Sequence, residues 1–599
     1  MESIIKWIVR RRRAVFTVFI IWAVIAAFAA ARVNVNYDIV SYLPKDEPST
    51  LAIAELTENF GATLPNASIA ARVDDVRDAL RLKQEIAAVE GVRDVIWLDD
   101  TLDIAKPLEM ADPEIVAGFY KDGYALYQVT GDTDNAAAVL ARLAQTFPEA
   151  HIVGSLVDLA SAQDAVGDEV GRIVAYAIPI VIFILLLSTH SWLEPLVFLI
   201  TIGIAILLNM GTNLILGEIS FLTQSVAAIL QLAVSMDYAI FLLHSFNGFR
   251  EQGIEPVPAM QKAMKKSLAA VFSSSITTVV GFLALIFMRF RLGADLGLVM
   301  AKGIALAFIT VMVFMPTFIL LVYKWIEKTQ HRSFLPDMSG LGRFVVKARW
   351  GILLLVALLI VPGFLASRNN EYIYGMGAYP PESRFQQDRE FVDELFGKQV
   401  QLALMVPTGN IPAELKLQAE LEQTPNVTNV MSYVSAVDPV IPPEVIDNDQ
   451  LSMLVSKKYN LFIVTAKGGG EGPAAFAMTA EIRRLANNHY GDAYQLAGEP
   501  ANMLDMKNTI EEDDIIVNGL AILAIALTIM AVYRSFSLPL LLVLTIEFAI
   551  WINLSIPYFT NTPLSYIGYL IISTVQLGAT VDYAILYTEH YLGNRTKYT

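Results

Sequence analysis

Two matching stretches of sequence indicate the plan of this chain: QLAVSMDYAI at residues 231–240 and QLGATVDYAI at residues 576–585. Six of the ten positions are identical, and both stretches lie within long apolar runs. Each stretch places an aspartate and a tyrosine inside an expected membrane helix, at Asp237 and Tyr238 and again at Asp582 and Tyr583. The match predicts a chain built from two similar halves.

The composition is that of a membrane protein. Of the 599 residues, 55% are hydrophobic and 17% are charged, and the mean hydropathy is +0.50, which lies outside the usual range of soluble domains. Apolar runs of about 20 residues recur, the length that crosses a hydrocarbon core of roughly 30 Å. The ten predicted spans lie at 14–33, 170–189, 193–216, 221–246, 268–288, 295–323, 350–367, 514–533, 538–558 and 565–591.

Lysine and arginine concentrate in the loops that are cytoplasmic when the N-terminus is inside, as the positive-inside rule requires. This orientation predicts a multi-pass protein of the cytoplasmic membrane, with residues 34–168 and 368–512 outside the cytoplasm. The first apolar run follows four arginines, Arg10 to Arg13, an arrangement that also occurs in secretory signals. The length of the run and the spans that follow it favour an uncleaved first span.

Composition and motifs disfavour several classes of function. The chain has no cysteine, which excludes disulfides, thiolate catalysis and cysteine-based metal sites. It has no Walker phosphate loop, GxSxG elbow, HExxH motif or histidine–carboxylate cluster at metal spacing. We therefore expect neither an enzyme nor a bound cofactor or metal. The net charge of −16 arises mostly in residues 34–168, which indicates a solvated domain rather than a nucleic-acid site.

The two outer segments share one expected order of elements, that of the split βαβ (ferredoxin-like) fold. In the first segment, strands are predicted at 66–73, 92–98, 124–130 and 150–155, with helices at 74–89 and 133–146. In the second, strands are predicted at 400–406, 427–434, 460–466 and 492–498, with helices at 412–422 and 473–486. The predicted fold class is a polytopic α-helical membrane protein with two α+β extracytoplasmic domains, arranged as two parallel repeats.

These elements define the expected domain boundaries. They are 1–33 for the first span, 34–168 for the first outer domain, 169–325 for spans 2 to 6, 326–349 for a cytoplasmic linker, 350–367 for span 7, 368–512 for the second outer domain and 513–599 for spans 8 to 10. The duplication places the counterparts of the spans at 268–288 and 295–323 beyond residue 599. Spans 11 and 12 are thus absent from the sequence.

A carboxylate inside a membrane helix costs several kcal/mol unless it is paired, protonated or exposed to water. Two carboxylates at matching positions, Asp237 and Asp582, therefore indicate groups that load and release protons. The alternative is that they only accept hydrogen bonds that hold neighbouring spans together. Tyr238 and Tyr583 project about 100° away from their own aspartates on a helix, so we expect them to bond to the opposite half.

Further polar residues inside the spans are candidates to support such a relay. His244 and Glu589 follow the two aspartates by seven residues, two turns along the same helix face, and could form an ion pair or a proton exit. Hydroxyls at Ser274, Ser275 and Thr277 could reach the carboxylates, although membrane hydroxyls often serve helix packing alone. Glu547 is a further intramembrane acid, and Gly203 occupies the matching place in the first half.

The sequence resembles the RND superfamily, in particular its MmpL-type branch of hydrophobe and amphiphile exporters. The resemblance rests on one span, an outer domain and five spans, followed by a second copy, and on the Asp-Tyr pairs in the fourth span of each half. It implies that Asp237, Tyr238, Asp582 and Tyr583 form the proton relay of an antiporter. It also implies that the outer domains form a porter module, and it matches Ser274 only approximately to a fifth-span hydroxyl.

The leading hypothesis is export of a lipid or other amphiphile driven by the proton-motive force, with protons as the coupling ion and no other cofactor. The expected partners are membrane lipids or a lipid-like substrate, and either further copies of the chain or a periplasmic or cell-surface accessory protein. One alternative is a sterol-sensing-like receptor that binds lipid without proton coupling, which gains nothing from two buried acids. Another is a protein-export accessory of the SecD/SecF type.

Overall fold

The computed structural model describes residues 2–61, 64–100, 113–331, 334, 339–375, 382–436 and 454–595. Within these ranges the side chains of residues 114, 164–170, 174, 339, 567, 571, 574–575, 579, 582, 586, 589–590 and 592–595 are not described. The chain divides into two compact units. We call Met1–Asn36, Val166–Tyr372 and Glu512–Thr599 the helical unit, and Tyr37–Ala165 with Ile373–Glu511 the sheet unit.

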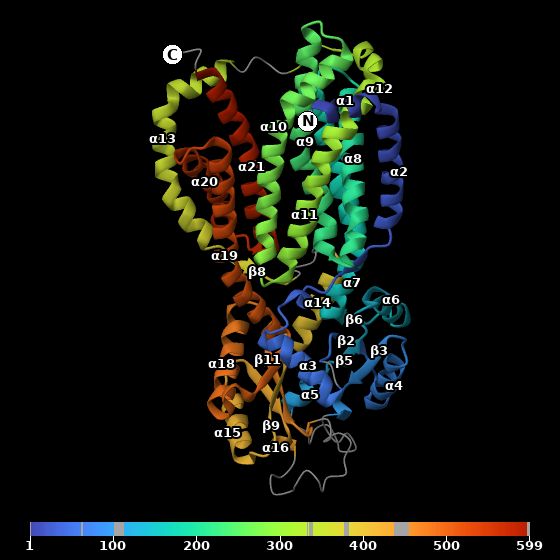
Figure 1. Cartoon of the computed structure of the whole chain (residues 1–599). Helices are drawn as coiled ribbons and strands as arrows, with labels where there is room; N and C mark the ends of the chain where they lie inside the picture. Colours follow the sequence, from blue (N-terminus) through green and yellow to red (C-terminus); the bar gives the residue numbers. More distant parts are fainter. Residues whose placement is uncertain are drawn as a thin grey trace. The chain divides into compact units, whose positions relative to one another are not determined.

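Long apolar helices make up the helical unit (Figure 1). They are α2 (Arg12–Ala30), α7 (Ser155–Ser188), α8 (Glu194–Thr212), α9 (Phe221–Glu251), α10 (Pro256–Leu283), α11 (Arg291–Ile309), α12 (Met315–Lys328), α13 (Ser339–Arg368), α19 (Glu499–Tyr533), α20 (Ser537–Thr560) and α21 (Tyr566–Arg595). A π-helical turn at Thr310–Phe314 joins α11 to α12. A short helix, α1 (Glu2–Arg10), precedes them. The first turns of α7 and α19 belong to the sheet unit.

Nine helices in the described part of the chain are long and apolar enough to cross a membrane. They correspond to the first nine predicted spans, with α11 and α12 together forming one of them. The tenth predicted span, 565–591, coincides with α21, several of whose side chains are outside the described set. The chain is therefore a polytopic helical membrane protein.

Small residues allow close contact between helices of this unit. A Cβ on Gly211 of α8 would lie only 2.4 Å from the carbonyl oxygen of Ala26 in α2. Gly281 of α10 faces Gly578 of α21, where a Cβ would lie 3.7 Å from the Cα of Gly578. Such glycines let two backbones approach within a membrane, and α10 runs beside α21 as a result (Figure 1).

The first sheet of the sheet unit contains β2 (Ala67–Arg72), β3 (Val92–Ile96), β5 (Tyr124–Gly131) and β6 (His151–Val153), with β4 (Tyr120–Lys121) beside β5. The strand order is β3-β5-β2-β6, and neighbouring strands in this order are antiparallel. Helices α4 (Val76–Ala87) and α6 (Ala136–Thr146) follow the first and third of the four main strands. This is the strand order of the split βαβ fold.

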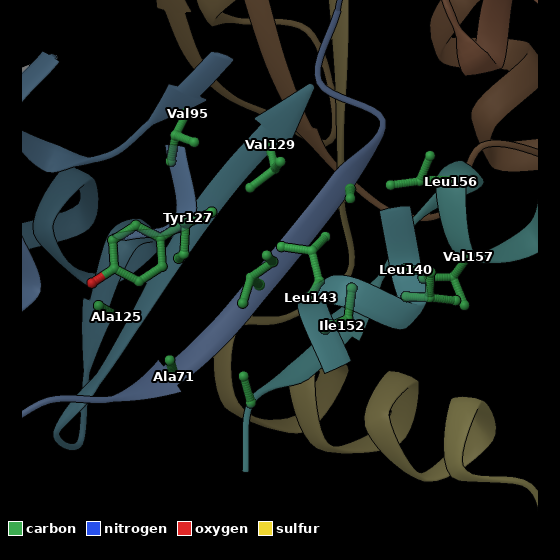
Figure 2. Close-up of a cluster of buried hydrophobic side chains, with 14 of the residues drawn as sticks. Ala71, Val95, Ala125, Tyr127, Val129, Leu140, Leu143, Ile152, Leu156 and Val157 are labelled. Atoms are coloured by element: carbon green, nitrogen blue, oxygen red, sulfur yellow. The ribbon is translucent and has the colours of Figure 1, made fainter. Parts of the chain in front are cut away.

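A compact apolar core covers one face of this first sheet (Figure 2). Tyr127 and Val129 of β5, which project to the same face, are fully buried with Leu143 of α6. The alternation along β5 follows the two-residue period of a strand. The Tyr127 hydroxyl donates to the carbonyl of Ala79 in α4 at 2.9 Å, so its polar end is also satisfied.

The second sheet has the corresponding order, β10-β11-β9-β12. Its strands are β9 (Gln399–Pro407), β10 (Val427–Met431), β11 (Tyr459–Lys467) and β12 (Gln495–Gly498). Helix α15 (Ile411–Glu422) follows β9 and α18 (Pro473–Tyr490) follows β11. Shorter elements elsewhere in the chain are α5 (Pro113–Phe119), α16 (Tyr433–Ala436), β1 (Asn34–Asn36), β7 (Glu218–Ser220), β8 (Tyr372–Ile373) and β13 (Leu564–Ser565).

Two helices are exchanged between the sheets. Helix α3 (Pro48–Phe60) precedes the first sheet in sequence, yet its Ala52 and Leu56 pack on Ala403 and Met405 of the second. Helix α14 (Arg384–Phe396) precedes the second sheet, yet its Val392 and Phe396 pack on Ala70 and Leu126 of the first. The exchange ties the two sheets into one unit.

Candidate functional site

Helix α9 carries the first Asp-Tyr pair. Its start is capped by Ser220, whose Oγ accepts from the backbone N–H of Thr223 at 3.0 Å, and a largely apolar run that also contains Gln231 and Ser235 leads to Asp237. Asp237 is half-buried, whereas Tyr238 on the adjoining face is buried, with 2% of its surface exposed. The acid therefore lies at a helix surface where another helix or water can reach it.

The second pair lies on α21. Tyr583 is 56% exposed, and its hydroxyl donates a hydrogen bond to the carboxylate of Asp237. The phenol of one stretch thus contacts the acid of the other, across the two halves of the sequence. Asp582 and Glu589 are also on α21, but their side chains lie outside the described residues.

Helix α10 contacts both α9 and α21. The hydroxyl of Thr278 donates to the carbonyl of Gly578 at 3.3 Å, next to the Gly281 contact. A glycine at 578 brings the α21 backbone close enough for this bond. The three helices that bear the relay candidates are therefore joined by small and hydroxyl-bearing residues, which pack closely in membranes.

The hydroxyl candidates on α10 are buried, and two of them bond to their own helix. Ser275 donates to the carbonyl of Phe272 at 3.1 Å, and Thr277 donates to the carbonyls of Ser273 at 2.8 Å and Ser274 at 2.7 Å. Ser274 is 4% exposed. The hydroxyls of Ser275 and Thr277 thus bond within α10.

His244 lies two turns beyond Asp237 on α9, and its Nε2 is 3.2 Å from the carbonyl oxygen of Ser188. Its ring is also 6.3 Å, centroid to centroid, from that of His190 in an edge-on arrangement. The nearby Glu194 carboxylate is buried and accepts from the His190 backbone N–H at 2.9 Å. The described surroundings of His244 therefore belong to the first half of the chain.

One polar contact occurs in both halves. The side-chain amide of Asn209 donates to Gln231 at 3.0 Å, and that of Asn553 donates to Gln576 at 3.1 Å. These glutamines open the two matching stretches, six residues before the aspartates. Each pair joins the span before the Asp-Tyr helix to that helix.

A lysine that the sequence reading did not single out lies within α11. The Nζ of Lys302 donates to the carbonyl oxygen of Asn209 at 3.0 Å and to the side chain of Asn213. Its neighbour Gly303 accepts from the side chain of Gln231 at 2.9 Å. A cationic side chain inside a membrane span marks a candidate functional residue. Lys302 could therefore have been singled out from the sequence.

Glu547 belongs to a second polar cluster, in α19, α20 and α21. It is half-buried on α20 and interacts electrostatically with Asp514 of α19. Asp514 Oδ1 accepts from the Tyr569 hydroxyl at 2.8 Å and from the Asn518 amide at 2.8 Å. Sequence reasoning missed Asp514 because it lies at the start of a predicted span, where an acid needs no explanation.

The sheet unit contains a cavity of about 450 Å³. Apolar side chains from both halves line it, including Ile53 and Leu56 of α3, Val400 of β9 and Met503 of α19. Carboxylates of Asp38, Asp158 and Glu499 also contribute to the lining. A cavity whose lining mixes apolar and polar side chains has the character of a site for an amphiphilic molecule.

Comparison with known proteins agrees with this arrangement. The model of the MMPL family matches residues 41–350 and 400–595. The membrane protein YdfJ of Bacillus subtilis is 22% identical over 90% of this chain and 74% of its own length. The transport protein MmpL12 of Mycobacterium tuberculosis is 23% identical over 48% of this chain and 25% of its own length. The apo-petrobactin exporter of Bacillus anthracis is 21% identical over 54% and 45%.

Several curated relatives are matched over less than half of their length: the chain covers 36% of a Methanocaldococcus jannaschii membrane protein and 41% of one from Streptomyces coelicolor. The family model nevertheless covers both halves of this chain, including both Asp-Tyr stretches. Those stretches lie on helices that a hydrogen bond joins. This chain belongs to the MMPL family.

Proposed function

We propose that the chain is a secondary transporter that uses the proton-motive force to export a lipid or other amphiphile from the cytoplasmic membrane. The observation that carries the proposal is the hydrogen bond from Tyr583 to Asp237. It makes the contact between two helices depend on the ionisation of one acid. A proton that binds Asp237 neutralises the acceptor, and a neutral hydrogen bond is roughly half as strong as a charge-assisted one.

The coupling then works through the contact of α21 with α9 and α10. While Asp237 is ionised, the phenol of Tyr583 holds α21 against α9. Protonation weakens this bond and frees α21 to shift along the surface of α10, which bears Gly281 and Thr278 there. By the symmetry of the two stretches, Tyr238 has the same role toward Asp582. The four residues Asp237, Tyr238, Asp582 and Tyr583 together form the proposed relay.

We also propose that the two halves are parallel repeats. The equivalent Asn–Gln pairs and the equivalent strand orders of the two sheets support this. On this basis the N-terminus is cytoplasmic and the sheet unit is the extracytoplasmic porter module. His244 and Glu589 would serve proton release toward the cytoplasm, and Ser274, Ser275, Thr277 and Glu547 would support the relay from their own helices.

The substrate class is inferred from the cavity of the sheet unit. Its apolar lining suits an acyl or other hydrophobic chain, and its carboxylates suit a polar head. The names of two relatives, a transport protein and an exporter, agree with outward movement of a small molecule. We propose membrane lipid or a lipid-like molecule as the partner, protons as the coupling ion, and assembly with further copies or an accessory protein.

The test is reconstitution of the purified chain into vesicles with an imposed pH gradient. Movement of a fluorescent phospholipid between leaflets and proton uptake, reported by an enclosed pH dye, would be followed together. We expect Asp237→Asn and Asp582→Asn to abolish both signals. Wild-type rates of lipid movement and proton uptake in both variants would contradict the proposal.

A further inference from the structure

The short helix α1 and the start of α10 form a basic crevice. The crevice has a volume of about 250 Å³ and is lined by Ile5, Lys6, Lys262 and Lys265, together with Glu2, Pro258 and Gln261. Three of these seven residues are cationic and one is anionic. Nothing in the proposed transport mechanism uses these groups, so the crevice needs an explanation of its own.

Helix α1 is anchored on one side and exposed on the other. Ile5, Ile8 and Val9 are buried, with 7%, 5% and 2% of their surface exposed, and α1 contacts α10. The opposite side exposes Ile4 at 65% and Trp7 at 53%. Exposed tryptophan and aliphatic side chains beside lysines are typical of a helix that lies in the interface of a membrane.

The lysines of the crevice are exposed and only partly neutralised. Lys265 is 63% exposed and pairs with Glu2, which is 62% exposed. Lys262 lies over the ring of Phe249 with its Nζ 6.0 Å from the ring centroid. Among the described residues no ion pair is recorded for Lys6 or Lys262. Four arginines, Arg10 to Arg13, continue the basic surface where α1 meets α2.

We propose that this crevice binds the headgroup of an anionic phospholipid. The charge complementarity is direct, because three ammonium groups surround a space large enough for a phosphate-bearing headgroup. Ile4 and Trp7, which do not line the crevice, place α1 in the membrane interface, where the phosphate at hand belongs to lipid headgroups. Clusters of lysine and arginine beside a membrane helix attract anionic lipids in this way.

The site has a route to the rest of the helical unit. α1 packs on the first part of α10, and the far part of α10 carries the Thr278 bond to Gly578 of α21. A bound lipid that fixes α1 against α10 therefore stabilises the helix that contacts both Asp-Tyr helices. The expected readouts are lipid retention and thermal stability of the intact chain, neither of which requires transport.

The test compares two triple variants of the purified full-length chain. Lys6→Gln, Lys262→Gln and Lys265→Gln remove the crevice lysines, whereas Lys324→Gln, Lys328→Gln and Lys347→Gln remove three exposed lysines near the ends of other helices. Retention of phosphatidylglycerol and phosphatidylcholine would be measured by native mass spectrometry, and melting temperature with each lipid added. A lysine near an anionic surface contributes roughly fivefold, so the crevice variant should bind phosphatidylglycerol on the order of 100-fold more weakly.

A third variant, Lys6→Arg, Lys262→Arg and Lys265→Arg, should retain phosphatidylglycerol, because it keeps the charge. We expect phosphatidylcholine and inorganic phosphate to give little stabilisation of the wild type. Equal retention of phosphatidylglycerol by the two glutamine variants would overturn the proposal. So would equal stabilisation by inorganic phosphate alone, since that result assigns the crevice to a soluble anion.

Discussion

Tyr583→Phe tests the proposed relay with the smallest possible change, because it removes one hydroxyl from α21. The lost bond is the one from the phenol to the Asp237 carboxylate. A hydrogen bond to a charged group contributes about 1.5–3 kcal/mol. Because Tyr583 is 56% exposed, water replaces part of the bond, and the lower value of about 1.5 kcal/mol applies.

The protonated acid keeps a bond roughly half as strong, so the loss differs by about 0.7 kcal/mol between the two charge states, which is roughly a threefold change in the equilibrium between ionised and protonated Asp237. The phenol stabilises the ionised carboxylate, so its removal favours protonation. We therefore expect the pH at half-maximal transport to rise by about half a unit. The rate at neutral pH should fall, since release of the proton becomes the slow step.

The assay is proton uptake into vesicles that contain the chain, measured over a series of outside pH values. The matched control is Tyr587→Phe, which removes the same hydroxyl one turn further along α21 from a tyrosine that is 77% exposed. The control should keep the wild-type pH profile. Identical profiles for the two variants would refute the relay function of Tyr583 and leave the bond to Asp237 as packing.

Three further predictions concern stability. Gly211→Ala places a Cβ 2.4 Å from the Ala26 carbonyl oxygen. It should cost about 3 kcal/mol of folding free energy and lower the melting temperature. The control Gly203→Ala, where the added Cβ meets open space on the same helix, should not destabilise the chain. Asp505→Asn breaks the ion pair between Asp505 and Arg483, whose Nη2 lies 2.8 Å from Asp505 Oδ2. The same oxygen also accepts from the backbone N–H of Ser49. This loss should cost about 3–5 kcal/mol in chemical denaturation, whereas Glu481→Gln, at the exposed pair with Arg484, should have little effect. Burial raises the pKa of Glu414 above its ordinary value, so the folded chain holds a proton that the unfolded chain releases, and stability should fall as the pH rises past the ordinary glutamate range. Melting temperatures of Glu414→Gln should lack this decline, and an unchanged decline would assign it to another group.

The membrane spans could be predicted from the sequence because their signal is local. A run of about 20 apolar residues has few alternatives to a membrane helix, and nine described helices match the predicted runs. The strands of the two sheets follow from a local signal as well. Strand β5 spans Tyr124–Gly131 where residues 124–130 were expected, because Ala125, Tyr127 and Val129 project to one face of the sheet and Leu126 packs on the other.

The exchange of α3 and α14 between the sheets could not be predicted in this way. Both helices are amphipathic. Their apolar positions predict that one face of each helix is buried, but they do not indicate which of the two sheets buries it. The deciding contacts, such as Ala52 with the second sheet and Val392 with the first, join residues hundreds of positions apart. The Asp514–Tyr569 hydrogen bond could not be predicted for the same reason, because neither residue is unusual in its own segment.

The membrane helices of the two halves carry different charged residues besides the Asp-Tyr pairs. In the first half the membrane helices carry Lys302 on α11 and His244 two turns beyond Asp237. In the second half α19 and α20 carry Asp514 and Glu547, and Gly203 stands in the place that matches Glu547 in the first half. Charged groups near a carboxylate shift its charge state according to their sign. The two aspartates occupy matching positions in the sequence, and the charged groups beyond them differ between the halves, which would give the proposed relay two distinct acids.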